Sequence, residues 1–249
     1  MRIMTSVKED RVERIVHGTD MASNAWFLSA KRIMETVFPG PKSELRVADP
    51  GCLEGGFSVE FERLGFRVLG LEIRENNYAA CQYVKSKTDL PSLEFVQDDA
   101  WNIARYGPFD AVFCCGLLYH LDRPKQFLQT LSSVTSKLLI LQTHFATERA
   151  NPKFGLSELV ENEGLQGRWY TEYATAQDFQ NRESMKWSSW DNRRSFWIQR
   201  EHLIQAIRDV GFDLVMEQYD SLGPDIAGSM TGGFYHSDNR GTFIGIKTR

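Results

Sequence analysis

Short apolar runs alternate with segments of helical periodicity over the first 145 residues of the chain. The apolar runs predict five strands, at Leu45–Ala48, Phe66–Leu71, Leu93–Val96, Phe109–Cys115 and Lys137–Leu141. The segments between them predict helices at 55–64, 76–85 and 124–135. Regular alternation of strand and helix is typical of a parallel sheet with right-handed crossovers. We therefore expect an α/β fold.

A helical lead-in precedes the first strand. Ser23 or Asn24 is placed to cap a helix that continues to Val37, with apolar residues near a 3.6 period. The Phe38-Pro39-Gly40-Pro41 stretch ends this helix. Exposed patches on the lead-in would allow a homodimer, and the oligomeric state stays open.

The pattern changes after residue 145. Residues 145–198 have little clean periodicity but hold four of the six tryptophans, which predicts a lid, a binding loop or a small subdomain. A helix over 200–210 then leads to two last strands, Phe212–Met216 and Thr242–Lys247. A glycine-rich loop, Gly223–Gly241, is predicted between these strands.

Composition excludes several classes of protein. A hydrophobic content of 42% and a charged content of 25% are ordinary for a soluble globular protein. The net charge of −4 gives no bulk electrostatic reason for nonspecific nucleic-acid binding. No apolar segment approaches the roughly 20 residues that span a bilayer, and the N-terminus lacks the apolar region of a secretory signal. The four cysteines, none in a C-x-x-C pair, are interpreted as reduced core thiols of a cytoplasmic protein.

Two acids and a glycine-rich turn follow the first two strands. The turn has the spacing Asp49-x-Gly51-x-x-x-Gly55-Gly56, and Glu72 ends the second strand. The carboxyl ends of parallel strands form the edge where open α/β sheets bind ligands. The G-x-G-x-x-G spacing of dinucleotide folds is missing, and Asp49 would repel a pyrophosphate. A cationic nucleoside without phosphate, such as S-adenosylmethionine, suits these charges, with Glu72 placed to accept two hydrogen bonds from a ribose diol.

This stretch resembles motif I of the class I S-adenosylmethionine-dependent methyltransferases, and the resemblance covers about residues 45–145 and 199–249. Glu72 matches the ribose-binding acid of that family, and Asp99 matches the acid that contacts the adenine amine. Phe109–Phe113 resembles motif IV, and Gly116–Leu121 resembles the turn beside the methyl donor. Pro50 and Leu53 depart from the usual glycine pattern. The resemblance implies S-adenosylmethionine as cofactor, bound by Asp49, Gly51, Gly55, Glu72, Asp99, Ala100, Cys115 and Gly116.

The family also implies a fold and a division of the chain. The expected fold is Rossmann-like, a seven-stranded mixed sheet with helices on both faces and an antiparallel last strand. We expect a single domain over residues 1–249. Its parts are a helical lead-in (1–42), a cofactor-binding half (43–144), an aromatic insertion or lid (145–198) and a C-terminal helix with a strand pair (199–249).

Transfer of a methyl group to a hydroxyl requires a group that takes the proton, and imidazole suits that task near neutral pH. His120 and His144 follow the fourth and fifth strands, and His236 lies in the loop before the last strand. These three are the candidate bases, whereas His17 and His202 lie on helical faces and are interpreted as structural or exposed. No ligand spacing supports a metal site, so none is predicted.

The aromatic segment 169–197 has three interpretations: the core of a subdomain, a platform that stacks on a sugar or ring, or a base-stacking surface for RNA. Arg193 and Arg194 beside Trp190 and Trp197 favour an anionic or planar acceptor. The candidate acceptor-binding residues are Tyr119, Trp169, Trp190, Arg194 and Tyr235.

The sequence predicts methyl transfer from S-adenosylmethionine to an oxygen of a small molecule, with sugars among the candidates. The segment Gly51–Gly56, with Tyr119 and His120, most resembles a subgroup of sugar and small-molecule O-methyltransferases. The same subgroup is close to tRNA wobble-uridine methyl- and carboxymethyl-transferases, and the acidic pI of about 5.8 weighs against a tRNA partner. Two further hypotheses are a non-catalytic module that binds the cofactor and a nicotinamide-dependent oxidoreductase, and the glycine spacing disfavours the second.

Overall fold

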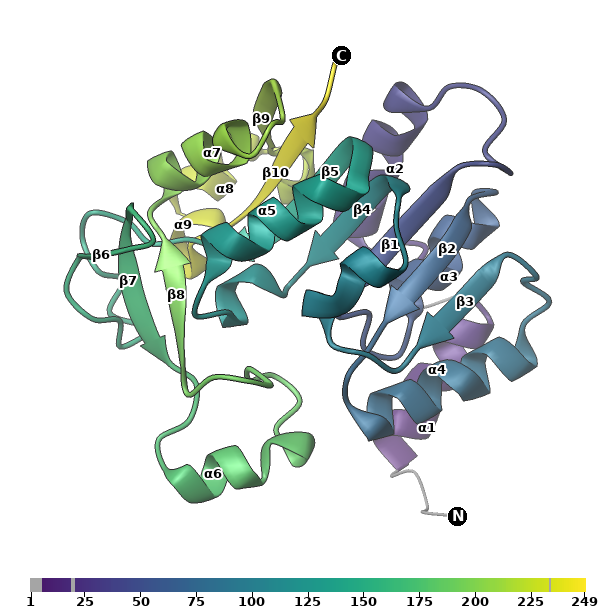
Figure 1. The fold of residues 1–249 in the computed structure, drawn as a ribbon, viewed down its shortest axis with the longest axis horizontal. Coiled ribbons are helices and arrows are strands. Elements are labelled where there is room, and N and C mark those ends of the chain that lie inside the picture. The colour runs from purple at the N-terminus through teal and green to yellow at the C-terminus, as the bar shows by residue number, and fades with distance from the viewer. Residues whose placement is uncertain (1–5, 19–20, 233) are drawn as a thin grey trace. The chain divides into compact units, whose positions relative to one another are not determined.

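The computed structural model describes residues 6–18, 21–232 and 234–249 (Figure 1). The chain forms two compact units, Met1–Asn102 and Ile103–Arg249. Their boundary lies inside the segment 43–144 that was expected to hold the cofactor, and the single domain with its internal boundaries stays a prediction.

The first unit is built from parallel strands joined by helices. Its strands are β1 (Arg46–Pro50), β2 (Arg67–Leu71) and β3 (Leu93–Val96). Its helices are α1 (Ser6–Val16), α2 (Ala25–Val37), α3 (Gly56–Arg63) and α4 (Glu75–Lys87), with the start of a short 3-10 helix, η1 (Ala100–Arg105), at its end. Strand β2 pairs in parallel with both β1 and β3, which gives the order β3-β2-β1.

Local sequence sets the ends of these helices. The side chain of Asn24 accepts hydrogen bonds from the backbone N–H groups of Trp26 (2.9 Å) and Phe27 (3.4 Å), so the predicted cap of α2 is confirmed. Gly65, just beyond α3, has a φ of 97°, a left-handed conformation that glycine adopts without strain. The helix therefore ends where the sequence predicted.

The second unit contains the other strands of the main sheet and most of the short helices. Its strands are β4 (Phe109–Cys115), β5 (Thr135–His144), β9 (Leu214–Gln218) and β10 (Arg240–Ile246). Its helices outside the insertion are α5 (Pro124–Val134), α7 (Arg200–Asp209), α8 (Ile226–Thr231) and α9 (Phe234–Asp238), with the 3-10 turns η2 (Leu118–His120) and η4 (Asp220–Leu222). Strand β4 is parallel to β5, and β10 is antiparallel to both β5 and β9.

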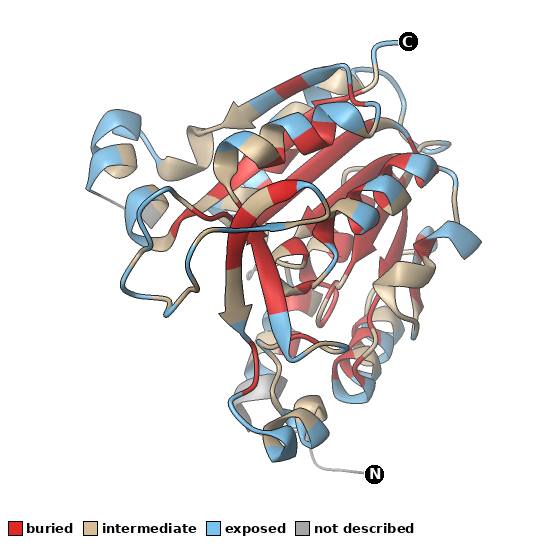
Figure 2. Ribbon diagram, turned by 60° about the vertical axis from the view of Figure 1, so that its left-hand side comes forward, coloured by how far each residue is buried: buried red, intermediate tan, exposed pale blue. Residues whose placement is uncertain are grey.

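The seven main strands, β3-β2-β1 from the first unit and β4-β5-β10-β9 from the second, make up a mixed sheet. The predicted seven-stranded Rossmann-like fold with an antiparallel last strand is confirmed. Burial explains why apolar runs predicted these strands: β4, β5 and β10 are buried along most of their length, whereas the helices alternate between buried and exposed faces (Figure 2).

The segment 145–198 is more regular than its sequence indicated. It contains an antiparallel sheet of β6 (Val160–Asn162), β7 (Leu165–Thr171) and β8 (Arg194–Ile198), with α6 (Ala176–Gln180) and η3 (Arg182–Ser184) between β7 and β8 (Figure 1). A buried charged residue interrupts the alternation of apolar and polar residues that would have predicted β7. Arg168, in β7, is only 4% exposed, and its guanidinium donates to the carbonyl oxygens of Thr147, Glu148 and Ser157.

Two further expectations need correction. The predicted loop Gly223–Gly241 contains α8 and α9, and the carboxylate of Asp225 caps α8 by accepting from the N–H of Gly228 at 3.0 Å. The fifth strand continues past Leu141 to His144 because the polar side chains of Gln142 and Thr143 are buried in the sheet. Hydrophobic periodicity does not reveal a short helix that is defined by its cap, such as α8. It also does not reveal a strand end whose buried side chains are polar, such as that of β5.

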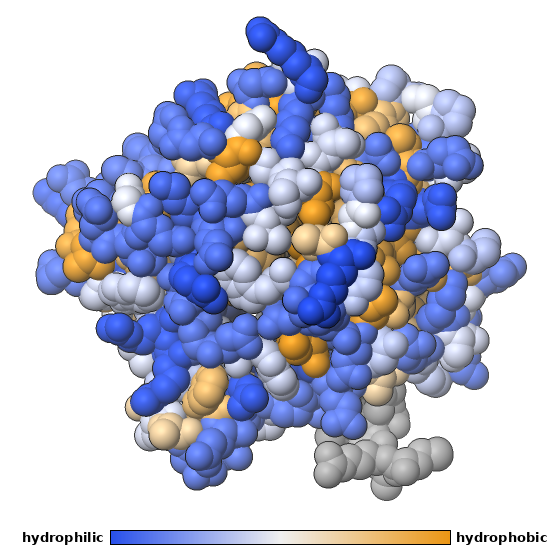
Figure 3. Space-filling view, viewed as in Figure 1, coloured by the Kyte–Doolittle hydropathy of each residue, from blue (hydrophilic) through white to orange (hydrophobic). Residues whose placement is uncertain are grey.

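Hydrophilic side chains cover most of the face shown in Figure 3, and apolar side chains gather there in small groups. Among the described residues, the exposed large apolar side chains are spread over several elements, with two of them in β9: Leu28, Val160, Trp187, Leu214, Met216 and Ile226. Across the described ranges of the chain, no helix combines the length and hydrophobicity that crossing a membrane requires.

Gly167 in β7 provides a test of the small sheet. A Cβ atom there would lie 2.3 Å from the carbonyl oxygen of Trp197 and 2.6 Å from the ring of Phe196. Gly167→Ala is therefore expected to lower the free energy of unfolding by about 1–3 kcal/mol through overpacking. Urea unfolding followed by tryptophan fluorescence measures this. Gly40→Ala is the control, because nothing lies within 4 Å of its Cβ position. Equal unfolding midpoints for the two variants would contradict the packing described here.

Candidate active site

Asp49 lies near the carboxyl end of β1 and is only 2% exposed. The hydroxyl of Ser58, in α3, donates to one carboxylate oxygen at 2.7 Å. Burial raises the pKa of Asp49 to about 7; the Ser58 bond opposes this shift, and the negative charge of Glu72 adds to it. Ionised Asp49 is thus a charge in need of a cationic partner.

Glu72 follows β2 directly and is 4% exposed. One of its oxygens accepts from the N–H of Leu53 at 2.9 Å, and the other accepts from the N–H of Arg74 at 2.8 Å. Burial raises its pKa to about 7, and these hydrogen bonds act in the opposite direction. Each carboxylate oxygen has two lone pairs, so the group keeps acceptor capacity for a diol.

The loop between β1 and α3 is held in an unusual backbone conformation. Gly51, Leu53 and Gly55 have φ values of 75°, 54° and 81°, all left-handed. At Gly55 a Cβ atom would lie 2.3 Å from the ring of Phe95, so both conformation and space require glycine. Leu53, the departure from the family's glycine pattern, adopts the same left-handed conformation, which costs a non-glycine residue about 1–2 kcal/mol. The bond from its N–H to Glu72 helps to hold it there.

Asp98 and Asp99 follow β3 and are half-buried. Asp98 accepts from the N–H of Asp99 at 2.8 Å and from the side-chain amide of Asn102 at 2.7 Å. Asp99 accepts from the N–H of Trp101 at 2.9 Å, within η1, which begins at Ala100. Both acids thus organise this turn, and the adenine contact of Asp99 and Ala100 stays a prediction.

In the second unit, three of the predicted residues come together. Tyr119 and His120 lie in η2, after β4, and His144 ends β5. The ring of Tyr119 is 4.2 Å from that of His120 and 4.5 Å from that of His144, between centroids. The structure thus brings together two of the candidate bases and one candidate acceptor-binding residue.

Cys115 and Gly116 connect β4 to this cluster. The thiol of Cys115 is 3.7 Å from the side-chain oxygen of Gln142, and the N–H of Gly116 donates to the carbonyl of Gln142 at 2.8 Å. Gly116 has a φ of 76°. A Cβ atom there would lie 3.3 Å from the guanidinium of Arg240 and 3.7 Å from the hydroxyl of Tyr119. The left-handed conformation and the close approach of Arg240 therefore both favour glycine at this position.

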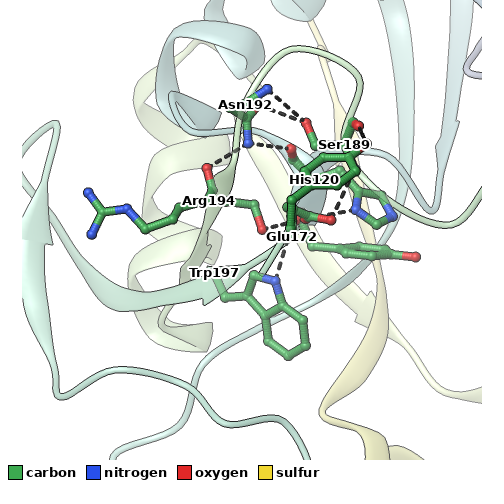
Figure 4. Close-up of polar contacts among 9 residues, drawn as sticks. His120, Glu172, Ser189, Asn192, Arg194 and Trp197 are labelled. Atoms are coloured by element: carbon green, nitrogen blue, oxygen red, sulfur yellow. Dashed lines mark hydrogen bonds and ion pairs between the residues drawn. The ribbon is translucent and has the colours of Figure 1, made fainter. Parts of the chain in front are cut away.

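His120 contacts a carboxylate that sequence reasoning missed. Its Nδ1 lies 2.9 Å from Glu172, whose side chain is only 1% exposed, against 15% for that of His120 (Figure 4). The same carboxylate accepts from the hydroxyl of Ser195 at 2.6 Å and from the N–H of Ser189 at 3.0 Å. Glu172 stands in a segment without periodicity, next to no motif, so no sequence signal marked it.

His144 has a different environment. Its Nδ1 is 2.7 Å from the carbonyl oxygen of Asp238, so this nitrogen carries the proton and donates it. Its ring stacks on Trp197, with 4.6 Å between centroids and an interplanar angle of 11°. Burial lowers the pKa of His144 to about 4, and the positive charge of Arg240 contributes to the shift. His144 is therefore neutral near pH 7.

Several predicted residues are engaged elsewhere. The ring of Trp169 lies beneath the guanidinium of Arg194 at 4.9 Å, and that of Trp190 beneath Arg182 at 4.7 Å. The hydroxyl of Tyr235 accepts from Arg200 and donates to Glu217, and burial among these groups raises its pKa well above the usual range.

His236 lies in the short helix α9 and is exposed. No contact of His236 with His120 or His144 is found within the described part of the chain.

Comparison with known proteins agrees with this geometry. Residues 48–138 match a family model described as a methyltransferase domain. The mitochondrial ubiquinone biosynthesis O-methyltransferase of Dictyostelium discoideum is 30% identical in an alignment of 105 residues that covers 38% of this chain and 33% of that protein. The matches cover between 33% and 38% of the length of the curated relatives.

Solved structures resemble a larger part of the chain. The N-terminal domain of EvdMO1, crystallised in the presence of S-adenosylhomocysteine (SAH) and D-fucose, has a TM-score of 0.65 at 22% identity, covering 90% of this chain and 83% of that one. The 1,6-didemethyltoxoflavin-N1-methyltransferase of Burkholderia thailandensis, with its substrate and SAH bound, has a TM-score of 0.56 at 15% identity, covering 98% and 88%. The predicted resemblance is confirmed: the chain carries a methyltransferase domain at residues 48–138 and has the fold of the class I S-adenosylmethionine-dependent methyltransferases.

Proposed function

We propose that this protein transfers a methyl group from S-adenosylmethionine to a hydroxyl oxygen of a small molecule, with sugars among the candidate acceptors. The observation that carries this proposal is the pair of buried acids, Asp49 and Glu72, at one glycine-rich loop of the matched methyltransferase segment. The hydroxyl acceptor is inferred from His120, a partly exposed imidazole in the second unit.

The two acids suit the charges of the proposed cofactor. Burial raises the pKa of both Asp49 and Glu72 to about 7, so their ionised forms are costly without a nearby cation. The sulfonium and ammonium groups of S-adenosylmethionine would supply that charge, and the ribose diol would donate to the remaining lone pairs of Glu72. Bound S-adenosylmethionine supplies a methyl group on a positively charged sulfur.

His120 is favoured over His144 as the base. A hydroxyl that accepts a methyl group must lose its proton, and a base that works near neutral pH is efficient. His144 is a weak proton acceptor, because its pKa is lowered to about 4 by burial. His120 stays partly exposed, so an acceptor can reach it. His236, exposed on α9, has weaker support.

The aromatic insertion gives little support to a base-stacking surface for RNA. The rings of His144 and Tyr170 stack on that of Trp197 at 4.6 and 5.3 Å between centroids, and Trp197 is only 2% exposed, so its ring is already packed. Its indole N–H donates to the carbonyl of Tyr119 at 3.0 Å. This packing favours the subdomain-core interpretation for Trp197, and with it a small acceptor.

The acceptor class is tested by supplying methyl-labelled S-adenosylmethionine with three pools: hydroxylated small molecules including D-fucose, a metabolite extract, and total tRNA. The expected product is a labelled methyl ether of a small molecule, identified by mass spectrometry. Labelled tRNA, or a methyl group on nitrogen or carbon, would contradict the proposed acceptor. Binding of SAH without transfer to any pool would favour the non-catalytic module, and binding of NAD alone would overturn the cofactor assignment.

Replacing His120 tests its role as base. His120→Ala is expected to lower turnover by about 10²- to 10⁴-fold, because the acceptor proton loses its base. The affinity for SAH, measured by calorimetry, should stay unchanged. His17→Ala is the matched control, since His17 is exposed at the end of α1 and should leave both quantities as in the wild type. Wild-type turnover in His120→Ala would remove this histidine from the reaction.

Ligand-free protein should lose stability as the pH rises from 5 to 8. The folded-state pKa of Asp49, about 7, lies above its ordinary value of 3.8, so the native state keeps a proton that the unfolded chain has released. This contribution to the free energy of unfolding is complete below pH 4 and is lost as the pH rises through 7. At about 1.4 kcal/mol per pKa unit, it amounts to a few kcal/mol.

Thermal unfolding at several pH values measures this loss. Asp49→Asn should flatten the decline and raise the midpoint at pH 8. Asp213→Asn is the control, because Asp213 is exposed and its pKa is lowered, so its titration lies below the tested range. A decline in the Asp49→Asn variant as steep as in the wild type would contradict the assignment.

A further inference from the structure

We propose that Glu172 is a positioning residue for His120, and that the insertion sheet acts as the clamp which holds the catalytic turn. This inference rests on the proposed function, because it assigns a partner to the proposed base. It adds a residue, and a role for a whole segment, that the match over residues 48–138 does not include.

The clamp consists of hydrogen bonds from the insertion to three consecutive carbonyl groups of η2 and the residue after it. The indole N–H of Trp197 donates to the carbonyl of Tyr119 at 3.0 Å, and the side-chain amide of Asn192 donates to that of His120 at 3.1 Å (Figure 4). The backbone N–H of Phe196 donates to the carbonyl of Leu121 at 2.8 Å. The backbone that carries His120 is thus fixed from one side by β8 and the residues before it.

Glu172 extends the clamp to the imidazole. Its own N–H donates to the carbonyl of Arg193 at 3.0 Å, which fixes its backbone beside the start of β8. Donors from Ser189, Ser195 and His120 converge on its carboxylate, at 3.0, 2.6 and 2.9 Å. A carboxylate in this arrangement only accepts, so Nδ1 of His120 carries a proton and Nε2 presents a lone pair.

This tautomer is the one that a base requires. In the proposed step, a bond forms between the acceptor oxygen and the methyl carbon while the bond between sulfur and that carbon breaks, its electron pair staying on sulfur. The hydroxyl proton moves to Nε2 of His120. The proton on Nδ1 stays in place, and Glu172 remains ionised and faces the imidazolium charge.

Among the described residues, titratable or charged groups from several elements face His120 or its ring partner Tyr119. They include Glu172 from the insertion, Tyr170 from β7, Cys115 from β4, His144 from β5 and Arg240 from β10. Glu172 is the carboxylate of this group. His144 is neutral near pH 7 and the guanidinium of Arg240 is a cation, so the negative charge that stabilises a protonated His120 comes from Glu172.

The first experiment needs no acceptor. Nitrogen-15 NMR of the histidine rings, recorded on the SAH-bound protein, should show His120 as the Nδ1–H tautomer. In Glu172→Gln the tautomers should mix, because the amide no longer offers an acceptor-only group. Glu163→Gln is the matched control, because the Glu163 carboxylate accepts from the backbone N–H groups of Lys125 and Gln126 at 2.8 and 3.0 Å. This substitution should leave the His120 signals unchanged.

The second experiment uses methyl-labelled S-adenosylmethionine and the hydroxylated compound that the acceptor screen identifies. Glu172→Gln should lower kcat by about 10- to 100-fold, similar to the loss of other carboxylates that orient histidines. The KM for the cofactor should stay unchanged, and the acidic limb of the kcat profile should move to lower pH, since the imidazolium loses its counter-charge. Glu172→Asp restores the charge and should return the acidic limb toward its wild-type position.

A double-mutant cycle separates positioning from folding. If Glu172 acts through His120, then Glu172→Gln should cause no further loss of turnover in the His120→Ala background. Additive losses, or a wild-type tautomer and acidic limb in Glu172→Gln, would overturn the proposal. If Glu172→Gln fails to bind SAH or to fold, the wild-type spectrum still tests the proposal, because a His120 ring that is not the Nδ1–H tautomer would overturn it.

The outcomes also distinguish this inference from the proposed function. A fixed Nδ1–H tautomer that Glu172→Gln releases, in a protein that methylates none of the pools, would refute the function and leave the positioning role intact. If the protein methylates a hydroxylated compound and Glu172→Gln does not change its turnover, the proposed function stands and the positioning role of Glu172 is refuted.

Discussion

A carboxylate that leaves water must find hydrogen-bond donors within the protein, and this constraint organises both compact units. In the first unit Glu72 takes its donors from the backbone of Leu53 and Arg74. The loop that carries Leu53 must therefore curl back over the end of β2, and three of its residues adopt left-handed conformations to do so. The shape of the loop follows from the need to satisfy one buried acid.

The second unit solves the same problem with side chains. Glu172 takes donors from His120, Ser189 and Ser195, which belong to segments far apart in the sequence. The cost of burying this acid is offset only when η2, β8 and the connection before β8 are all in place. A buried acid of this kind makes its surroundings cooperative, because loss of any donor leaves a charge less well satisfied.

Sequence predicted the fold well where burial follows hydrophobicity. The strands Leu93–Val96 and Phe109–Cys115 have the bounds that their apolar runs indicated. The sequence did not predict the elements in which polar side chains are buried. The guanidinium of Arg168 bonds three carbonyls inside the insertion, so β7 does not alternate as a half-buried strand should. The polar network of Arg200, Glu217 and Tyr235 was likewise not expected from the sequence, and the acceptor-binding role of Tyr235 stays a prediction.

The site was predictable to the extent that its residues follow strands. Asp49, Glu72, His120 and His144 all stand at or just after strand ends, where topology alone assigns a ligand-binding edge. Glu172 follows a strand of the small sheet, which the pattern did not reveal, so its meeting with His120 had no local signature. His120 and Glu172 are 52 residues apart in the sequence, so only the tertiary structure brings them together.

The structure gives Trp197 a supporting role rather than a stacking role. A stacking platform needs an aromatic face without a partner, whereas the rings of His144 and Tyr170 both stack on Trp197 and its indole N–H is bonded. Trp197, which lies in the aromatic segment 169–197, thus fixes the backbone of Tyr119. This role is consistent with the rigidity of aromatic side chains, because large rings with few rotatable bonds hold a short turn at low cost in conformational entropy. The backbone of η2, which carries His120, gains a fixed orientation from these contacts.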